Sequence, residues 1–417
     1  MAAVTPPPAA FPIRRNSVLL AACLAASGGM MQVAVAVGTT TLVLVTGIES
    51  IVGLGPAIFL STAALAALPA GRAMDRYGRM PVVAGGFVAG ILATTLVALG
   101  CLWESTPLVV LGLGLVGASS GTVILSRAAA ADMYPAERRA RGISLVLFGA
   151  VFGAALGPLV FKPLFAGDTV DTDSLVLPWL VAGAIMVVGL LLALAVRPDP
   201  KRIGESLGYG VDENWTGNEE AAPLSTILRR PGVLAALVAA VASFAVMVSV
   251  MTLSGYIVVG HGHNQGDTFW VISVHIVGMY GLVLVVGDVI DRVGRRPALV
   301  GGLAVMGVST AFMAWIESVL AMSLSLFGLG LGWSLSYVAA TSELVDRAAL
   351  SERGRLVGFS DLLAGFTGAS LAILGGVAYD GLGVEAVAAG ATLAVALPAL
   401  LITVAGRRPQ EVAEATS

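Results

Sequence analysis

The chain has 417 residues, of which 57% are hydrophobic and only 12% are charged, and its net charge is −3. A soluble domain of this length could not cover its surface with so few charges, so the composition excludes a soluble globular protein. The small net charge gives no sign of a nucleic-acid partner.

The chain begins with an uncharged stretch rich in Pro and Ala, residues 1–12, which is followed by Arg14 and Arg15. A cleavable signal peptide is one interpretation of this start. The apolar run that follows is longer than the core of a signal peptide, and eleven more apolar stretches come after it. We therefore expect the first run to be a membrane helix.

Twelve stretches are long and apolar enough to cross a bilayer, which takes about 20 residues in a helix. The predicted spans are 18–42, 50–71, 82–102, 107–131, 142–165, 175–196, 232–258, 268–289, 298–316, 318–342, 355–379 and 383–405. We expect an all-α membrane protein with two six-helix bundles, 18–196 and 232–405. A linker, 197–231, joins them, and the tails are 1–17 and 406–417.

The basic residues indicate the orientation of these spans. With both termini inside, all but two of the 23 Lys and Arg residues fall on one side, and the exceptions, Arg127 and Lys162, lie within spans. Cytoplasmic loops are enriched in Lys and Arg. This distribution predicts a multi-pass protein of the cell membrane with its termini and its linker in the cytoplasm.

One charged loop motif occurs twice, at residues 71–82 and 287–298, each time between two apolar spans. Five identical residues recur 216 positions apart, and they are Gly71, Asp75, Arg76, Gly78 and Arg79, matched by Gly287, Asp291, Arg292, Gly294 and Arg295. A second, shorter sequence similarity relates residues 137–142 to residues 352–355. These repeats predict two homologous halves.

The duplicated loop resembles the signature of the major facilitator superfamily of secondary transporters. In that family the motif's Asp docks at the start of span eleven, and its last Arg pairs with an acid that ends span four. The resemblance implies that Asp75, Arg79 and Asp132 form a latch that holds the two halves together on the cytoplasmic face. The alternative is that these loops supply only topogenic charge and tight turns.

Span five carries small residues at four-residue spacing followed by a proline, and these are Gly149, Gly153, Gly157 and Pro158. They are similar to the motif of the family's drug:H⁺ antiporter branch. Two positions depart from that pattern, because Phe161-Lys162 replaces the trailing glycines and Leu113 replaces an expected Arg in span four. Ordinary close helix packing is the alternative interpretation.

Ionisable side chains inside a span indicate a function, because placing a charge at the centre of a membrane helix costs free energy. Arg127 and Asp361 both lie about 8–9 Å inside the cytoplasmic ends of their spans, at 1.5 Å per residue. We therefore expect a gate pair whose protonation at Asp361 couples H⁺ to transport, with Glu343 as another partner for Arg127. His275, in span eight, is a further candidate for proton coupling. A static pair, or snorkelling side chains, is the alternative.

Polar and aromatic side chains fall near the middle of spans one, four and ten, which line the central cavity in the superfamily. The candidates for substrate contact are Gln32, Ser119, Ser120, Trp333 and Tyr337. Neutral donors with few charges suit an uncharged or amphipathic organic molecule. Packing between helices is the alternative role.

These features predict a monomeric secondary transporter, most similar to proton-coupled exporters of small organic compounds. A proton-coupled importer or a facilitator of a metabolite is the alternative, and a receptor that keeps this fold is another. An enzyme is not expected, because the sequence has no nucleophile–base pair. We expect no metal and no cofactor, and no phosphate-binding loop for ATP is present.

Overall fold

The computed structural model describes residues 11–48, 54–156, 171–209, 222–260, 262, 265–316 and 318–415, and the regular elements in these ranges are helices. The N-terminal half contains α1 Ile13–Thr46, α2 Leu54–Tyr77, α3 Arg79–Leu102, α4 Thr106–Val123, α5 Ser126–Asp132, α6 Arg139–Leu156 and α7 Val176–Ala195. The linker contains α8 Pro200–Ser206 and α9 Leu224–Leu228. The C-terminal half contains α10 Val233–Gly260, α11 Gln265–Ile276, the π-helical turn η6 Val277–Gly281, α12 Val283–Val293, α13 Arg295–Phe312, α14 Val319–Asp346 and α15 Arg353–Ala415.

The helices agree with a multi-pass membrane protein. Ten helices in the described ranges are long and apolar enough to cross a membrane, or eleven if Trp270–Gly281 and Val283–Val293 form one span bent by 44°. The stretch Arg353–Val404 has 52 residues, more than twice the length that one crossing needs. Its backbone leaves the helical region at Gly383. Two crossings in this stretch are consistent with the predicted total of twelve.

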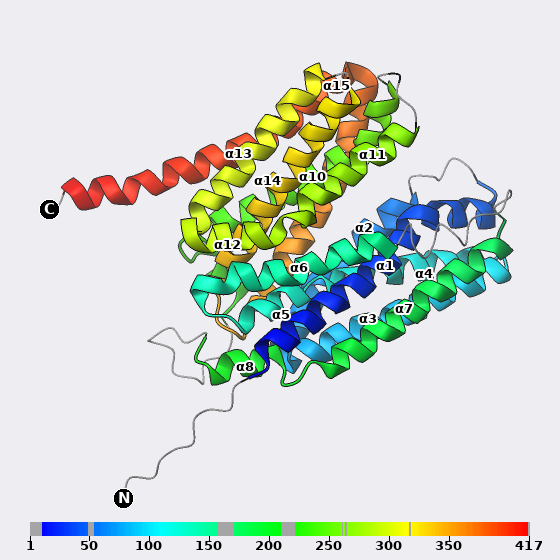
Figure 1. Ribbon diagram of the computed structural model, residues 1–417, viewed down its shortest axis with the longest axis horizontal. Coiled ribbons are helices and arrows are strands. Elements are labelled where there is room, and N and C mark those ends of the chain that lie inside the picture. Colours follow the sequence, from blue (N-terminus) through cyan, green and yellow to red (C-terminus); the bar gives the residue numbers. More distant parts are fainter. Residues whose placement is uncertain are drawn as a thin grey trace, which may run out of the picture.

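Both predicted tails are partly helical, which differs from the expected boundaries. The first helix starts at Ile13 instead of residue 18, and its polar first turn is held by hydrogen bonds from Arg15 to the carbonyl of Arg197 (2.8 Å) and from Asn16 to that of Pro198 (3.2 Å). The last helix continues to Ala415 instead of ending at 405, and Figure 1 shows it leaving the bundle. Hydropathy marks only the apolar part of a helix, so it misses both extensions.

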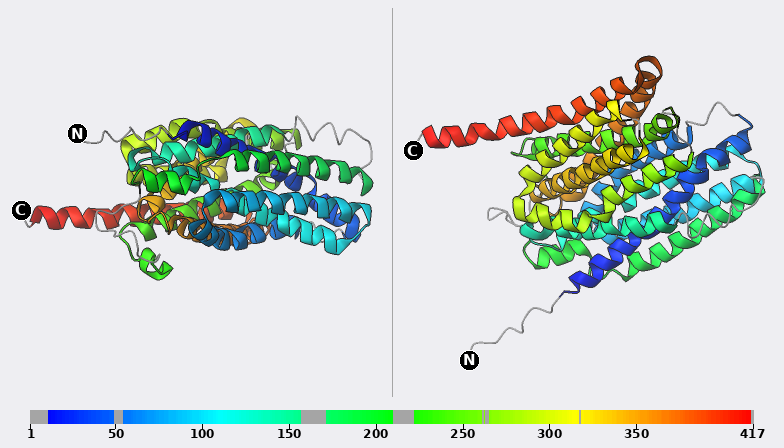
Figure 2. Two further views of the ribbon diagram at one scale, coloured as in Figure 1. Left: turned by 90° about the horizontal axis from the view of Figure 1, so that it is seen from below. Right: turned by 45° about the horizontal axis from the view of Figure 1, so that its top comes forward.

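The two halves form separate helix bundles that meet along two pairs of helices, α2 with α15 and α6 with α12. Figures 1 and 2 show the bundles close together at the end that carries α8 and diverging toward the other end. We name these the linker end and the opposite end. The first turn of α1 lies at the linker end, and the last turns of α15 project beyond the bundle.

Exposed tryptophans mark the opposite end of the molecule. Trp103 follows α3, Trp270 lies in the first half of α11 and Trp315 follows α13, and they are 64%, 60% and 77% exposed. Tryptophan is enriched where a membrane meets water, because its ring is apolar and its N–H is polar. We therefore expect one membrane interface at this level.

Candidate functional site

Asp75, the acid of the first loop motif, contacts the opposite bundle. Its two carboxylate oxygens accept the backbone N–H groups of Gly354 (2.8 Å) and Arg355 (2.7 Å), in the first turn of α15. The first N–H groups of a helix have no partner within the helix and carry the positive end of its dipole. The carboxylate of one bundle therefore caps a helix of the other.

Arg79 and Asp132 form the buried centre of the same contact. The Arg79 guanidinium donates to Asp75 (2.7 Å), to Asp132 (2.7 Å) and to the carbonyl of Leu350 in the other bundle (2.7 Å). Arg353 of that bundle donates to the second oxygen of Asp132 at 2.8 Å. Asp132 thus joins a guanidinium from each half, and its side chain is fully buried.

The second loop motif makes the matching contact in the reverse direction. Asp291 accepts the backbone N–H groups of Ala140 (3.3 Å) and Arg141 (3.0 Å), in the first turn of α6. Asp291 stands 216 positions after Asp75, and α6 takes the place that α15 has in the first contact. Each bundle therefore caps one helix of the other.

The side-chain network repeats as well. Arg295 donates to Asp291 (2.8 Å) and to Asp346 (3.2 Å), and Arg139 of the N-terminal bundle donates to the other oxygen of Asp346. Asp346 and Arg139 therefore correspond to Asp132 and Arg353. The sequence predicts Asp132 as part of the latch. Arg139 and Arg353 belong to the second repeat but were given no role in it, and Asp346 was not included. The 214-residue offset from Asp132 to Asp346 was the signal that could have found them.

The motif glycines have two different roles. A Cβ on Gly71 would lie 2.0 Å from the carbonyl oxygen of Gly354, and one on Gly287 would lie 2.5 Å from the hydroxyl of Ser144, so both allow the bundles to touch. Gly78 and Gly294 have φ angles of 96° and 93°, which side chains rarely adopt. Arg76 and Arg292 are exposed at the ends of α2 and α12.

The described part of the linker, residues 197–209 and 222–231, covers the first contact. Asp199 accepts a backbone N–H at the start of α3 (2.8 Å), and Lys201 donates to the carbonyl of Asp75 (2.6 Å). Arg353 donates to the carbonyl of Tyr209 at 3.2 Å. The sequence analysis missed α8, although an Asp followed by Pro is a typical helix start. The sequence of the linker also indicates a short surface helix around Trp215, and this residue lies outside the described residues.

Glu352 anchors the linker to the first turn of α15. It accepts from the guanidinium of Arg230 (2.5 and 3.0 Å) and from the backbone N–H groups of Ala349 (3.0 Å) and Ala222 (3.1 Å). Burial alone would raise the pKa of this carboxyl. The hydrogen bonds from Arg230 and from the two amides outweigh burial and hold the pKa below its ordinary value.

Deeper between the bundles, Arg127 of α5 and Asp361 of α15 form an ion pair. Nη2 of Arg127 lies 2.6 Å from Oδ1 of Asp361, and the two side chains are 1% and 12% exposed. Arg127 also donates to the carbonyl of Ile124 at 3.1 Å, where the helix breaks between α4 and α5. The structure thus brings together the two residues expected as a gate pair, one from each half.

Aromatic side chains of the C-terminal bundle surround this pair. The hydroxyl of Tyr337 donates to Asp361 (3.2 Å), and the Arg127 guanidinium lies 4.9 Å from the centre of the Tyr337 ring, within range of a cation–π contact. Trp333 stacks on Tyr337 with the ring centres 4.9 Å apart. Both expected cavity residues of α14 therefore lie at the ion pair.

The other expected gate residues lie elsewhere. Glu343 pairs with Arg347 on the same helix (2.8 Å) and not with Arg127. His275 is buried inside the C-terminal bundle, where Nδ1 lies 2.7 Å from the carbonyl oxygen of Leu326. Neither residue contacts the Arg127–Asp361 pair through these bonds.

The remaining candidates belong to the N-terminal bundle. Ser119 is buried and donates to the carbonyl of Gly86 on α3 (2.7 Å), which is a packing contact within the bundle. Gln32 and Ser120 are half-buried on α1 and α4. A Cβ on Gly149 or Gly153 of α6 would meet backbone carbonyls of α1 at 2.0 and 2.8 Å, so this stripe packs α6 on α1. Gly157, Pro158 and Lys162 lie outside the described residues.

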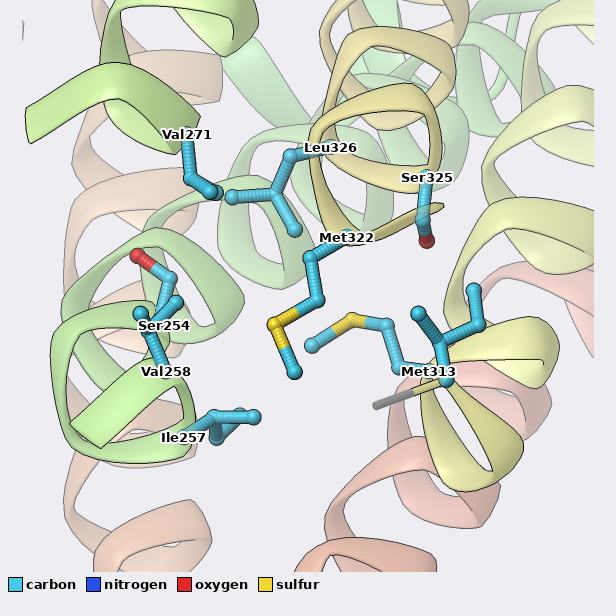
Figure 3. A pocket seen from close by; sticks show the side chains of 9 residues that line it. Ser254, Ile257, Val258, Val271, Met313, Met322, Ser325 and Leu326 are labelled. Atoms are coloured by element: carbon cyan, nitrogen blue, oxygen red, sulfur yellow. The ribbon is translucent and has the colours of Figure 1, made fainter. Parts of the chain in front are cut away.

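A small cavity lies inside the C-terminal bundle, away from the ion pair (Figure 3). Its lining is almost entirely apolar and includes the side chains of Met313, Met322 and Leu326. Its volume is about 10 Å³, close to the minimum for one water molecule. It is too small for an organic substrate.

Comparisons with known proteins agree with this architecture. Residues 18–287 and 261–417 match the family model of the Major Facilitator Superfamily. The chain is 30% identical to the MFS-type transporter YdeG of Bacillus subtilis (strain 168) over 85% of this chain and 83% of YdeG. It is 27% identical to the riboflavin transporter RfnT of Brucella anthropi, over 84% of this chain and 85% of RfnT.

The fold is also that of solved transporter structures. The human organic anion transporter MFSD10 (TETRAN) superposes with a TM-score of 0.77 at 14% sequence identity, over 94% of this chain and 100% of MFSD10. The paired loop motifs, the two bundles and these matches have one explanation. The chain belongs to the Major Facilitator Superfamily and is a multi-pass membrane transporter of small substrates.

Proposed function

We propose that this transporter exports a small organic compound in exchange for protons, with its linker end in the cytoplasm. The observation that carries the proposal is the Arg127–Asp361 ion pair, which joins the two bundles across 2.6 Å. A buried charge that loses its partner costs about 3–5 kcal/mol. The protonation state of Asp361 therefore has a large effect on whether the bundles stay together.

The cycle starts from the described conformation, in which the bundles meet at the linker end. A proton that arrives from the opposite end neutralises Asp361, and the attraction to Arg127 is lost. The bundles then part at the linker end, the proton leaves to the cytoplasm, and substrate enters. The ionised carboxylate pairs again with Arg127, the linker end closes, and substrate leaves at the opposite end.

The loop motifs supply the second part of this gate. Asp75 and Asp291 each cap a helix of the opposite bundle, so both contacts must break when the linker end opens. Because helix capping of this kind is worth about 1 kcal/mol per contact, these bonds can break and form again in each cycle. We propose that they act as the latch that the family resemblance implies.

A charge exchange tests the gate directly. We expect Arg127→Asp and Asp361→Arg each to abolish proton-driven transport in proteoliposomes, because each leaves two like charges face to face. The double variant restores opposite charges and should recover a measurable fraction of the flux. Glu385→Gln, an exposed position, is the control and should transport normally. A double variant as inactive as the single ones would contradict the pairing.

The likeness to the riboflavin transporter RfnT favours a second candidate, the transport of riboflavin by a proton-coupled importer or a facilitator. The same two-bundle cycle can run in either direction, so direction is decided by which state binds the proton and the substrate. Proteoliposomes with and without an imposed pH gradient, tested with dyes, drugs, metabolites and riboflavin, separate these outcomes. Accumulation against the substrate gradient supports proton coupling. Equilibration that ignores the pH gradient indicates a facilitator, and no flux of any compound indicates a receptor.

A further inference from the structure

The ion pair between the bundles adjoins a continuous group of four aromatic rings, which we name the aromatic cluster. Phe244 of α10 lies 6.0 Å from Tyr337, Tyr337 stacks on Trp333, and Trp333 meets the Tyr280 ring nearly edge-on at 5.7 Å. Phe244 and Tyr280 are half-buried, whereas Trp333 and Tyr337 are 2% and 3% exposed. The two outer rings therefore offer accessible aromatic surface on either side of a buried stack.

A π-helical turn places one of these outer rings. η6, Val277–Gly281, interrupts the eighth span and carries Tyr280. Such turns are rare and are frequently found at functional sites. The turn ends where the span bends by 44°, so the position of Tyr280 depends on this local departure from a regular helix.

Three polar atoms at this place are buried without a hydrogen-bond partner in the described part of the chain. They are Nε1 of Trp333, Nε of Arg127 and Oδ2 of Asp361. Buried polar groups in native proteins almost always have a partner. The first two atoms are hydrogen-bond donors and the third is an acceptor. A ligand that pairs with all three must therefore offer both an acceptor and a donor.

The charge at this place is balanced. Arg127 and Asp361 neutralise each other, and the aromatic side chains that touch them are neutral. A ligand with a net charge would find no counter-charge here, because Arg127 and Asp361 already neutralise each other. Burying such an uncompensated charge is strongly unfavourable.

We infer that the aromatic cluster binds a planar, uncharged heteroaromatic compound that carries a ring carbonyl and a ring N–H. One of its π-faces would contact Tyr280, its carbonyl would accept from the indole N–H of Trp333, and its N–H would donate to Asp361. This inference rests on the proposed transport function and names the substrate class for it.

Binding to the purified, unmodified protein tests the class without any variant. Lumichrome is a neutral three-ring heteroaromatic with ring carbonyls and N–H groups, and its fluorescence reports binding. Flavin mononucleotide carries a similar ring system with a charged phosphate, and ribitol has hydroxyls but no ring. We expect lumichrome to bind, flavin mononucleotide to bind at least tenfold more weakly, and ribitol not to displace lumichrome. Equal binding of the charged compound, or displacement by ribitol, would overturn the inference.

A tryptophan variant tests the predicted contact. Trp333→Phe keeps an aromatic ring and removes the indole N–H, and we expect it to weaken lumichrome binding about tenfold. Trp315→Phe, at an exposed position at the opposite end, is the matched control and should leave binding unchanged. Thermal unfolding of both variants checks that they are folded. A folded Trp333→Phe protein with unchanged affinity would contradict the contact.

The two proposals fail in different ways. If proteoliposomes accumulate a non-aromatic or charged compound and lumichrome does not bind, the substrate class is wrong while proton-coupled transport stands. If lumichrome binds with the expected selectivity but no compound crosses the membrane, the aromatic site stands and the transport cycle is wrong.

Discussion

The two copies of the loop contact differ at the level of single residues, although their chemistry is the same. Asp132 is fully buried and holds Arg79 and Arg353, whereas Asp346, its counterpart, is 19% exposed. The difference follows from α8, which covers only the first contact. Equivalent substitutions in the two copies therefore form a natural pair of variant and control.

We expect Asp132→Asn to destabilise the protein by about 3–5 kcal/mol, because it leaves two buried guanidinium groups without a carboxylate. Asp346→Asn should cost less, because Asp346 is 19% exposed and water partly screens the charges that remain. Thermal unfolding in detergent measures both. Equal losses would show that burial by α8 does not set the strength of the first contact.

The second prediction concerns Glu352, whose pKa in the folded protein lies below its ordinary value of about 4.3. A lowered pKa means that the folded protein holds this proton less readily than the unfolded chain. The carboxylate therefore stabilises the fold above about pH 4.3, and this contribution is lost as the pH falls through the folded pKa. We expect Glu352→Gln to be less stable than the parent at pH 7 by about 1.5–3 kcal/mol, the usual range for hydrogen bonds to a charged group.

Unfolding measured between pH 7 and pH 3 tests this sign. The difference between Glu352→Gln and the parent should shrink as the solution is acidified, because the parent loses its advantage. Glu205→Gln, at an exposed position of α8, should match the parent at every pH. A difference that stays constant or grows in acid would contradict the assignment.

At the residue scale, the sequence predicted contacts wherever a repeated motif or a costly buried charge marked them. Asp75 was placed at the start of span eleven, and Arg127 was paired with Asp361, and the structure brings these groups together. His275 was predicted to take part in proton coupling only because it is an ionisable residue inside a span. Its hydrogen bond to Leu326 depends on how α11 packs against α14, which the sequence does not reveal.

The helices α2 and α15 of the two bundles approach each other closely, and glycines make this possible. A Cβ on Gly358 would lie 2.3 Å from the carbonyl oxygen of Ala67, and the corresponding distance at Gly71 is 2.0 Å. Backbone atoms cannot move aside as a flexible side chain can. Any side chain at these positions must therefore push the two helices apart.

We expect Gly71→Ala to shift the protein toward conformations that are open at the linker end. Overpacking of this kind costs about 1–3 kcal/mol in the closed state, and the open state relieves it. Spin labels on Tyr77→Cys and Val293→Cys, exposed positions on α2 and α12, should report a longer distance in the variant. The native Cys23 and Cys101 are buried and so should not take up label.

Gly85→Ala provides the control for this experiment, since a Cβ on Gly85 of α3 has nothing within 4 Å. It should leave the distance unchanged and stabilise α3 by up to about 1 kcal/mol, the difference in helix propensity. If the distances in Gly71→Ala and Gly85→Ala are the same, the contact between α2 and α15 does not control the linker end.

At the scale of elements, hydropathy predicted where helices are and missed where they break. The fourth span is divided at residues 124–125, and the eighth contains η6, although both read as continuous apolar runs. These breaks place Arg127 and Tyr280 beside each other at the junction of the bundles. These breaks depend on packing between helices. The mean hydropathy of a single stretch of sequence carries no information about such packing.

At the scale of the whole molecule, duplication explains the exchange of contacts between the halves. Each bundle has one loop motif and one helix start, and each loop motif binds the helix start of the other bundle. The two contacts are therefore related by approximate two-fold symmetry. The linker breaks this symmetry. It joins the halves only once, and α8 therefore covers the first contact, whereas Asp346 of the second contact is 19% exposed.

The last prediction concerns the direction in which the molecule crosses the membrane. The exposed basic residues of the loop motifs and of α8 gather at the linker end, and exposed tryptophans mark the opposite end. Because basic loops are retained in the cytoplasm, we expect Arg202→Cys on α8 to react with a membrane-impermeant maleimide only in inverted vesicles. Trp103→Cys should react only in right-side-out vesicles. The reverse pattern would place the closed end outside and the open end toward the cytoplasm. A proton from outside the cell could then not reach Asp361 in the described state, and the proposed cycle would be wrong.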